Sequence, residues 1–344
     1  MRILVVTNMY PSDRQPHAGT FIEQQVKSLR EAGLDADVLV AERSQKGYLT
    51  YFGLGANIRR RISRMGHDLV HVMYGGVMAK NVLKAAINRP AVVSFCGSDL
   101  LGENLPGFVR KMAVTYGVWC SHFAARHADG IVVKSKNLWN ALPAIVEKEW
   151  VRIIPNGIDL RRFTPMDPRV SRQRLGWDEN RFHVLFPTNS GTPRKRFWLA
   201  QAAVEVTKLM GVPVELHRLE GLKHEEVPLW LNGGHCLILT SEHEGSPNIV
   251  KEALACNRPV VSVDVGDVAE RIMPIPGCYL SPAAPEALAE CLRRVFAGPP
   301  AVNSRAHLAN LSLEAVAEKL LHFYGQVLEK SQQAGRSSLS AGAR

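Results

Sequence analysis

The chain has 344 residues, of which 46% are hydrophobic and 22% charged, and its formal net charge at pH 7 is +10. This length and composition are typical of a globular protein with two domains, each able to bury its own core. The sequence has no run of about 18 apolar residues, which excludes a membrane-spanning helix, and its first residues lack the cleavage site of a signal peptide. The six cysteines follow no metal-binding or redox spacing, so we expect reduced thiols in a cytoplasmic protein.

The excess of positive charge lies in the first half of the chain, where residues 1–160 carry 20 Lys and Arg against 13 Asp and Glu. The densest basic cluster lies in a helix expected over residues 54–66 and consists of Arg59, Arg60, Arg61 and Arg64. A solvated basic face fits this helix, and so does contact with an anionic membrane surface or with an acceptor's phosphate. Nucleic acid is not expected as a partner, because no recognition motif accompanies the charge.

Short apolar runs alternate with helical patterns along the first half. Strands are expected at residues 2–7, 36–41, 69–74 and 91–95. A helix is expected over residues 107–127, with Trp119 and Phe123 in the core. Asp35 and Asp37 form a D-x-D, which we interpret as ordinary polarity where a strand begins and not as a metal motif. The alternation predicts the α/β class with parallel sheets.

The second half contains a strand, a loop and a helix that carry two carboxylates. An apolar run from Cys236 to Leu239 predicts a buried strand, and Pro247 marks an early position of the helix. Glu244 lies in the loop and Glu252 on the helix; a lone pair of such acids would ordinarily be solvated. The start of the helix favours an anionic ligand, however, because its first backbone N–H groups lack partners within the helix. These groups belong to Gly245, Ser246, Asn248 and Ile249.

From Glu244 to Gly266 the sequence reads E-G-x-P-N-x-x-x-E-A-x-A-C-x-x-P-V-V-x-x-D-V-G. This long, ungapped pattern resembles the donor-site signature of the retaining glycosyltransferases of family four, which have the GT-B fold. In that family the first glutamate faces the transferred sugar and the second holds the ribose of the nucleotide. The resemblance therefore implies a catalytic role for Glu244 and a donor-binding role for Glu252.

The GT-B fold implied by the resemblance has two doubly wound, Rossmann-like domains that face each other across a cleft. On this chain we expect an acceptor-binding domain over residues 1–165 and a donor-binding domain over residues 166–311. A helix over residues 312–330 is expected to cross back to the first domain. The small, polar tail at 331–344 is expected to be disordered.

A basic loop follows the strand expected at residues 182–187. The family has an Arg and, about six residues later, a Lys for the diphosphate here; Lys195 matches the Lys, and Asn189 stands where the Arg is usual. Arg194 or Arg196 can supply the missing charge, since a diphosphate leaving group needs cations. We therefore expect Lys195 to be catalytic and the other three residues to bind the donor. No metal and no cofactor are expected, because these cations and a helix N-terminus can stabilise the diphosphate.

The acceptor is expected at the loops of the first domain. The strand at 91–95 ends in Cys96-Gly97-Ser98-Asp99, which resembles the family's H-G-S-D with Cys in place of His. Asp99 is the catalytic candidate there, and a carboxylate that only braces its loop is the rival interpretation. Gly19, Tyr74 and Gly75 are expected to contact the acceptor.

The reaction implied is transfer of a hexose from a UDP-, GDP- or dTDP-sugar to an acceptor hydroxyl with retention at the anomeric carbon. The acceptor expected is a saccharide or a lipid-linked saccharide of bacterial-type cell-surface polysaccharide or glycolipid synthesis, and the enzyme is expected to be cytoplasmic and peripheral on the inner face of the cell membrane. Two alternatives share the fold: a nucleotide-sugar epimerase, and a catalytically silent sugar-nucleotide binding protein. A Rossmann oxidoreductase is disfavoured, because no G-x-G-x-x-G follows an expected strand.

Overall fold

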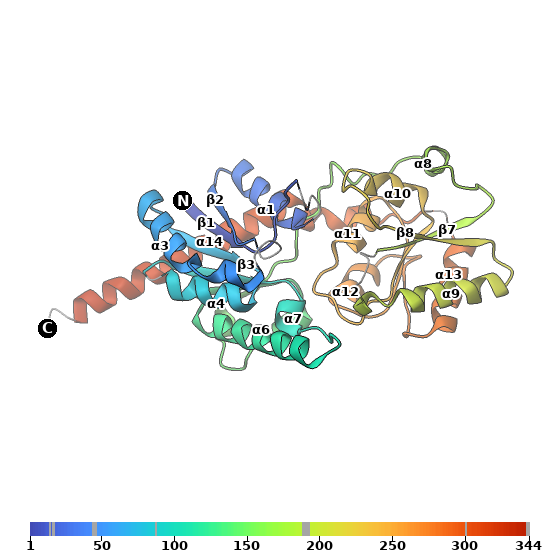
Figure 1. Ribbon diagram of the computed structural model, residues 1–344. Coiled ribbons are helices and arrows are strands. Elements are labelled where there is room, and N and C mark those ends of the chain that lie inside the picture. The colour runs from blue at the N-terminus through green and yellow to red at the C-terminus, as the bar shows by residue number, and fades with distance from the viewer. Residues whose placement is uncertain are drawn as a thin grey trace. The chain divides into compact units, whose positions relative to one another are not determined.

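The chain folds into two compact units, seen in a computed structural model that describes residues 1–13, 15, 18–42, 47–86, 88–187, 193–299 and 301–341 (Figure 1). The first unit comprises Met1–Gly157 together with the chain from Leu313 onward, and the second comprises Ile158–Ser312. The N-terminal segment of the first unit therefore ends at residue 157, before the expected domain boundary at residue 165. The reason is that Ile158 pairs with Ser312 in an isolated parallel bridge and that Phe163 is buried in the second unit's core.

The first unit is built on a six-stranded parallel sheet. Its strands are β1 (Arg2–Thr7), β2 (Asp35–Val40), β3 (Leu69–Met73), β4 (Ala91–Phe95), β5 (Gly130–Val133) and β6 (Val151–Ile153). The strand order is β2-β1-β3-β4-β5-β6, so the direction of winding reverses between β1 and β3. The central strands are buried on both faces, which explains why they read as continuous apolar runs.

Helices cover both faces of this sheet. They are α1 (Thr20–Glu31), α3 (Leu54–Met65), α4 (Gly76–Ala85), α5 (Ser98–Leu101), α6 (Phe108–His127), α7 (Lys136–Asn140) and α14 (Leu313–Ala341), with the 3-10 turns η1 (Gly47–Tyr51) and η2 (Lys148–Trp150). One face packs against α1 and α14, and the other against α3, α4, α6 and α7.

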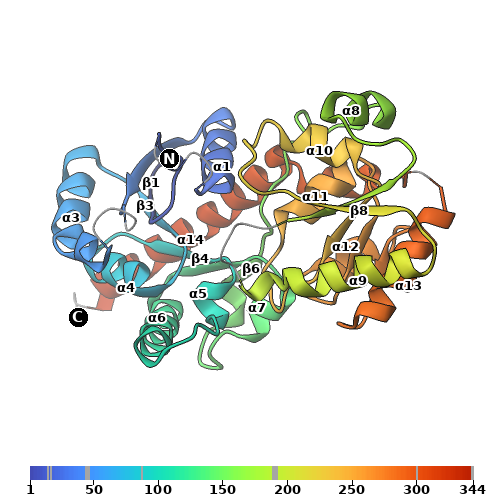
Figure 2. The same cartoon turned by 45° about the vertical axis from the view of Figure 1, so that its right-hand side comes forward.

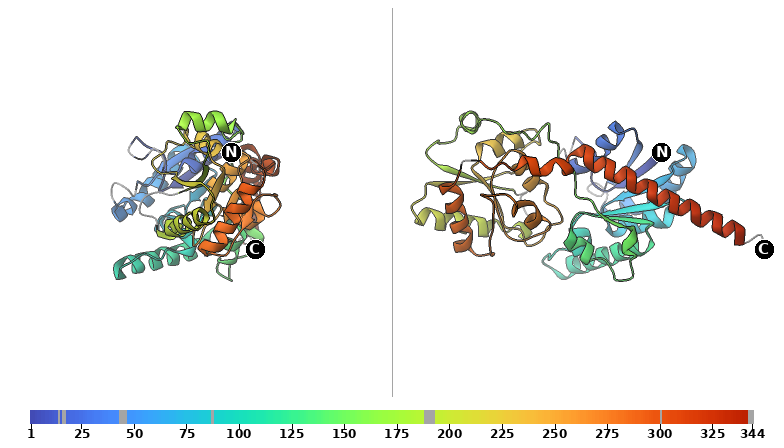
Figure 3. Two further views of the ribbon diagram at one scale, coloured as in Figure 1. Left: turned by 90° about the vertical axis from the view of Figure 1, so that its right-hand side faces the viewer. Right: turned by 180° about the vertical axis from the view of Figure 1, so that it is seen from behind.

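Helix α14 rests directly on the first sheet, along which it runs in Figure 3. A Cβ atom at Gly130 would lie 2.7 Å from Val327 Cγ2, so only a glycine on β5 admits the helix this closely. The buried Tyr324 hydroxyl lies 2.6 Å from Nδ1 of His71 on β3. The helix continues to Ala341, so the tail expected to be disordered from residue 331 is helical through residue 341. Residues 331–341 contain no proline and a single glycine, which lets the helix extend.

The second unit, seen from another side in Figure 2, is built on a five-stranded parallel sheet with the same winding as the first. Its strands are β7 (Phe182–Phe186), β8 (Val214–Arg218), β9 (Cys236–Leu239), β10 (Val260–Ser262) and β11 (Tyr279–Leu280), in the order β11-β10-β9-β7-β8. Its helices are α8 (Pro168–Leu175), α9 (Phe197–Leu209), α10 (Val227–Gly233), α11 (Asn248–Ala255), α12 (Val268–Ile272) and α13 (Pro285–Ala297), with the 3-10 turns η3 (Pro193–Lys195) and η4 (Arg305–Leu311). Helices α9 and α13 pack on one face, and α10, α11 and α12 on the other.

Both units are therefore doubly wound α/β sheets, as the sequence predicts. In such sheets ligands bind outside the carboxyl ends of the strands, at the point where the winding reverses. That point lies between β1 and β3 in the first unit and between β7 and β9 in the second. Ligand-binding residues are therefore expected at these two reversal points.

The expected core role of Trp119 is wrong. Its side chain is 52% exposed, whereas α6 buries Cys120, Ser121 and Ala124. Small side chains face the sheet because they let the helix approach closely, and the large aromatic side chains are left on the outer face. Phe123 is half-buried and stacks with His127.

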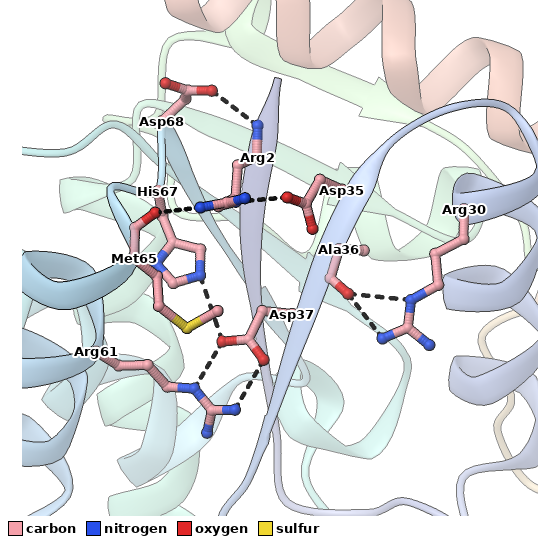
Figure 4. A network of polar contacts seen from close by, with 9 residues as sticks. All are labelled: Arg2, Arg30, Asp35, Ala36, Asp37, Arg61, Met65, His67 and Asp68. Carbon is pink, nitrogen blue, oxygen red and sulfur yellow. Dashed lines mark hydrogen bonds and ion pairs between the residues drawn. The ribbon is translucent and has the colours of Figure 1, made fainter.

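The D-x-D carboxylates are paired with arginines within the first unit (Figure 4). Asp35 forms an ion pair with Arg2, and both oxygens of Asp37 accept hydrogen bonds from Arg61 at 2.6 and 2.7 Å. The Arg30 guanidinium donates to the Ala36 carbonyl between them. The two acids therefore anchor the start of β2 to neighbouring elements, which fits the structural interpretation of the motif.

Candidate functional site

The loops that follow β7 and β9 are joined to each other at the reversal point of the second unit. The Thr240 hydroxyl donates to the carbonyl of Lys195 at 2.9 Å, and the Glu242 N–H donates to the carbonyl of Arg194 at 2.8 Å. Segments far apart in the sequence thus form one rigid platform, because the parallel pairing of β7 and β9 ends both strands at the same sheet edge.

Glu244 and two basic residues form a compact ion cluster on this platform. The Glu244 carboxylate is only 9% exposed and lies 2.6 Å from Lys195 Nζ and 3.2 Å from Arg194 Nη1. Burial alone would raise the pKa of Glu244, but the combined attraction of Lys195 and Arg194 outweighs it and holds that pKa below its ordinary value. The carboxylate therefore stays charged and holds both cations where the predicted donor diphosphate would lie.

The Arg196 side chain contacts the backbone of the loop after β9. Its guanidinium donates to the carbonyls of Thr240 at 2.6 Å and Ser241 at 3.0 Å, and its backbone is left-handed with φ of 51°. These bonds offset the cost of that conformation and brace the loop after β9. The structure thus gives Arg196 a positioning role beside its predicted donor-binding role. The predicted donor residue Asn189 lies outside the described residues.

The start of α11 is fixed by a buried polar network. Pro247 is the N-cap of the helix, one position before the expected helical site. The Ser246 hydroxyl donates to Asp267 Oδ2 at 2.9 Å, the same carboxylate pairs with Arg271 at 2.9 Å, and Lys251 Nζ donates to Ser246 Oγ at 3.2 Å. The network holds the loop that leads into α11: Gly245 and Ser246 precede the N-cap, so only Asn248 and Ile249 of the four predicted donors belong to the helix itself.

Gly266 allows the loop after β10 to pack against the start of α11. Gly266 has φ of 62°, and a Cβ atom there would lie 2.4 Å from the Gly245 carbonyl oxygen. The loop after β10 therefore reaches the start of α11 only because residue 266 has no side chain. The sequence motif ends at Gly266, but the motif alone does not show that a side chain there would collide with the Gly245 carbonyl oxygen.

Glu252 faces a histidine that the sequence gave no reason to select. Its carboxylate is buried and lies 3.5 Å from His224 Nε2, while His224 Nδ1 lies 2.7 Å from Arg162 Nη1. Because a guanidinium can only donate, Nδ1 must accept, and the ring hydrogen is on Nε2 and points toward Glu252. The chain of contacts orients Glu252 at the second turn of α11. Asn248 and Ile249 form the first turn.

A cavity of about 360 Å³ lies at the carboxyl ends of the first unit's strands. Tyr74, Gly75 and Asp99, three of the residues predicted to meet the acceptor, line it together with Asn8 after β1. The inner side of α6, including Val114 and Val118, closes the cavity with apolar surface. Gly19 lies elsewhere, at the N-cap of α1, where a Cβ atom would lie 2.5 Å from the Met9 carbonyl oxygen.

The Asp99 carboxylate is occupied by backbone N–H groups of its own loop and of the loop after β3. It accepts backbone N–H bonds from Gly75 at 2.8 Å, Gly97 at 2.7 Å and Cys96 at 3.0 Å. Burial raises the pKa of Asp99, and these N–H donors act in the opposite direction. The contacts give Asp99 the loop-bracing role that the sequence left as the rival interpretation, and they also fix Gly75 at the wall of the cavity.

A buried lysine near this loop was missed by the sequence analysis. Lys134 follows β5 and is only 1% exposed, and its Nζ has no hydrogen-bond partner among the described residues. Burial lowers the pKa of Lys134 and, with the nearby Asp99 carboxylate, raises that of the Cys96 thiol to about 12. The thiol is therefore protonated at neutral pH. Lys134 and Ser135 follow an apolar strand, and nothing in that sequence pattern predicts that the lysine amine is buried.

Two family models match the chain and together cover most of both units. The model described as Glycosyltransferase Family 4 matches residues 5–162, and the model described as Glycosyl transferases group 1 matches residues 193–298. The chain belongs to glycosyltransferase family 4. The platform around Glu244 lies within the second of these matches, and the cavity beside Asp99 lies within the first.

Curated relatives of this glycosyltransferase are distant but span nearly its whole length. TuaC of Bacillus subtilis, provisionally named a teichuronic acid biosynthesis glycosyltransferase, is 24% identical over 86% of this chain and 89% of its own. The D-inositol 3-phosphate glycosyltransferase of Frankia alni is 23% identical over 92% of this chain and 84% of its own.

Solved structures place this glycosyltransferase in the GT-B fold. The sucrose-phosphate synthase of Thermosynechococcus elongatus superposes with a TM-score of 0.77 at 15% identity, covering 96% of this chain and 100% of that one. Anabaena HepE in complex with UDP-glucose superposes with a TM-score of 0.66 at 16% identity, covering 97% and 100%. These similarities show the fold, as the sequence predicts.

Proposed function

We propose that this glycosyltransferase transfers a hexose from a nucleoside-diphosphate sugar to an acceptor hydroxyl with retention, and that its second unit binds the donor. The observation that carries the proposal is the ion cluster of Glu244 with Lys195 and Arg194 at the reversal point of the second sheet. Two cations and a helix N-terminus converge there, which is the arrangement that stabilises a leaving diphosphate. HepE, a solved neighbour, was crystallised with UDP and with UDP-glucose, which supports a UDP-sugar as the first donor to try.

We assign the roles of the side chains from their contacts together with the roles that the family resemblance implies. Lys195 and Arg194 stabilise the negative charge that grows on the diphosphate as the glycosidic bond breaks. Glu244 holds both cations in place and faces the transferred sugar. Glu252, oriented by His224, accepts the ribose hydroxyls. Retention would follow if the acceptor attacks from the face that the diphosphate leaves, with a phosphate oxygen taking the acceptor's proton.

A donor panel tests this proposal. The whole chain is incubated with UDP-, GDP- and dTDP-sugars, and release of the nucleoside diphosphate is followed with and without saccharide acceptors. Acceptor-dependent release is expected, and NMR of the product should show the anomeric configuration of the donor. A change of the sugar without diphosphate release would indicate an epimerase. Thermal stabilisation by a donor with no release under any acceptor would indicate a silent binding protein.

The acceptor side points to a lipid-linked saccharide. Along α6, the side chains of Phe108, Met112, Tyr116, Trp119 and Phe123 recur at helical spacing on one outer face. Phe108 is 76% exposed and Met112 is 59% exposed. An apolar aromatic face of this kind on a helix suits insertion at a membrane interface.

Basic side chains flank this face. Lys80 Nζ lies 4.3 Å from the centroid of the Trp119 ring, and Lys84 Nζ lies 5.6 Å from that of Phe123. Arg110 and Lys111 follow Phe108 on the helix and are exposed. Aromatic rings beside cations suit the headgroup region of an anionic leaflet, where each basic residue contributes about 1 kcal/mol.

This proposal moves the membrane contact from α3 to α6. In α3, Ile58 is fully buried and Arg61 is paired with Asp37, so the apolar side of that helix serves the core. The inner side of α6, in contrast, lines the cavity that holds Tyr74 and Asp99. A lipid-linked acceptor anchored at the outer side would present its saccharide next to that cavity, and the similarity to TuaC supports a cell-surface polysaccharide as the product. No helix in the described part of the chain is both long and apolar enough to cross a bilayer.

A further inference from the structure

Two histidines and a glutamate from neighbouring strands lie together on the second unit's sheet. The register pairs His183 of β7 with Glu215 of β8 and pairs Leu185 with His217, so all three polar side chains project from the same face. One ligand atom from each lies within 4.8 Å of the other two. We propose that His183, Glu215 and His217 bind one divalent transition-metal ion of the zinc class.

The distances are close to those of a tetrahedral site. His183 Nδ1 lies 2.8 Å from His217 Nε2 and 4.0 Å from Glu215 Oε2. Zinc–nitrogen bonds of 2.0–2.1 Å place neighbouring ligand atoms about 3.3 Å apart, so the two imidazoles need to separate by roughly half an ångström. His217 is half-buried and the Glu215 side chain is 46% exposed, so both can make that adjustment.

The tautomer of His183 is already the one that a metal requires. Its Nε2 lies 2.9 Å from the carbonyl oxygen of Asp178, and a carbonyl can only accept, so Nε2 carries the hydrogen. The Nδ1 lone pair is therefore free of hydrogen and directed at His217 and Glu215. Histidine ligands in proteins are typically oriented by such a bond from the second ring nitrogen to a carbonyl.

Metal binding replaces one hydrogen bond. Without metal, His217 Nε2–H donates to His183 Nδ1. With metal, both nitrogens give their lone pairs to the ion, the Glu215 carboxylate adds an oxygen, and His217 carries its hydrogen on Nδ1 instead. Both imidazoles remain neutral throughout, and a water can fill the fourth position.

Aromatic rings enclose the two imidazoles. Trp177 stacks on His217 with ring centroids 3.9 Å apart and contacts His183 at 4.8 Å, and Trp230 meets His217 edge-on. Two imidazoles with one carboxylate suit zinc and its neighbours, whereas magnesium and calcium prefer oxygen ligands alone.

The position of the site indicates a structural role. His183 is the second residue of β7, about 10 Å of strand before the donor-binding loop at about 3.3 Å per residue. The ion would tie the edge strand β8 to β7 and would take no part in sugar transfer. Loss of the metal and loss of transferase activity are therefore separable results.

The test is a zinc titration of the whole, metal-stripped chain. Calorimetry with zinc chloride should give one equivalent, and cobalt chloride should give the visible absorption of a tetrahedral site. His217→Gln and Glu215→Gln should each weaken zinc binding at least tenfold. His307→Gln, which changes an exposed histidine of the same unit, should bind zinc as the unmodified chain does.

Thermal unfolding gives a second measurement. Zinc should raise the melting temperature of the unmodified chain and of His307→Gln, and it should raise that of His217→Gln much less. His183 is left unchanged because it is fully buried and its loss could unfold the unit. Absence of zinc binding at micromolar concentration, or equal binding by His217→Gln and His307→Gln, would overturn the proposal. Diphosphate release measured in the same samples reports on sugar transfer independently.

Discussion

Removing the outer apolar side chains of α6 should release the protein from membranes without unfolding it. Full burial of a Phe or Met side chain is worth about 1.5–3 kcal/mol. Phe108 is 76% exposed and Met112 is 59% exposed in the free protein, and neither belongs to the buried clusters. Scaled by these fractions, the two together contribute about 2–4 kcal/mol to insertion, which corresponds to about a 30- to 1000-fold change in the partition coefficient.

The assay is sedimentation with vesicles of phosphatidylcholine alone and of phosphatidylcholine with phosphatidylglycerol. Phe108→Ser/Met112→Ser should lose binding to the anionic vesicles with little change in melting temperature, because exposed side chains contribute little to folding. Leu209→Ser/Met273→Ser is the matched control, since both residues are exposed apolar side chains of the second unit. Binding should also fall as salt rises, because the flanking cations are screened. Equal binding by the two double variants would refute the role of α6.

Further predictions concern the donor platform. Lys195→Ala should lower turnover by about 100-fold or more while Lys208→Ala, which changes an exposed lysine of the same unit, leaves steady-state rates unchanged. Glu252→Gln and His224→Ala should both raise the donor dissociation constant in calorimetry, whereas Glu286→Gln on α13 should not; unchanged affinity in the first two would remove Glu252 from the site. Gly266→Ala should destabilise by about 1–3 kcal/mol in urea unfolding, more than Gly211→Ala, because both have positive φ but only position 266 meets a carbonyl oxygen. The Glu244 pKa is depressed, so its stabilising contribution is present above the ordinary value of 4.5 and is lost as pH falls through the lower, folded value. The melting temperatures of Glu244→Gln and the unmodified chain should therefore differ near neutral pH and converge in acid.

Much of the fold was predictable because its strands and helices have distinct periodicities. Buried parallel strands read as continuous apolar runs, and the central strands of both sheets lie where those runs are. The edge strand β8 reads VELHR and was not predicted. The outward position of Trp119 was not predictable from its own helix, because large side chains at helical spacing look the same whether they face a core or a membrane. The orientation of α6 is set by its small residues Cys120, Ser121 and Ala124, which pack against the sheet and leave Trp119 on the outer face.

The grouping of residues on the platform proposed to bind the donor was predictable where these residues lie within one segment. Glu244 and Glu252 are eight positions apart on a single loop and helix, so their pattern survives in the sequence. The partners that orient them come from elsewhere in the chain: Lys195 reaches Glu244 from the loop after β7, and His224 reaches Glu252 from beyond β8. Pairings across such separations depend on sheet register, which a single sequence does not encode as a motif. His183 and His217 were missed for the same reason.

The position of α14 has a consequence for how this protein is made. The strands β1 to β6 are translated before the second unit, yet one face of their sheet is covered by Leu320, Phe323, Tyr324 and Val327, which are translated about 170 residues after β6. Until α14 has been synthesised, that face of the nascent first unit exposes apolar side chains and the polar His71 without its tyrosine partner. The second unit, in contrast, is continuous from Ile158 to Ser312 and can complete its core while the chain is still on the ribosome. The first unit to be translated is therefore the last to finish folding, and a chain cut before residue 313 should yield an aggregation-prone first unit beside a folded second one.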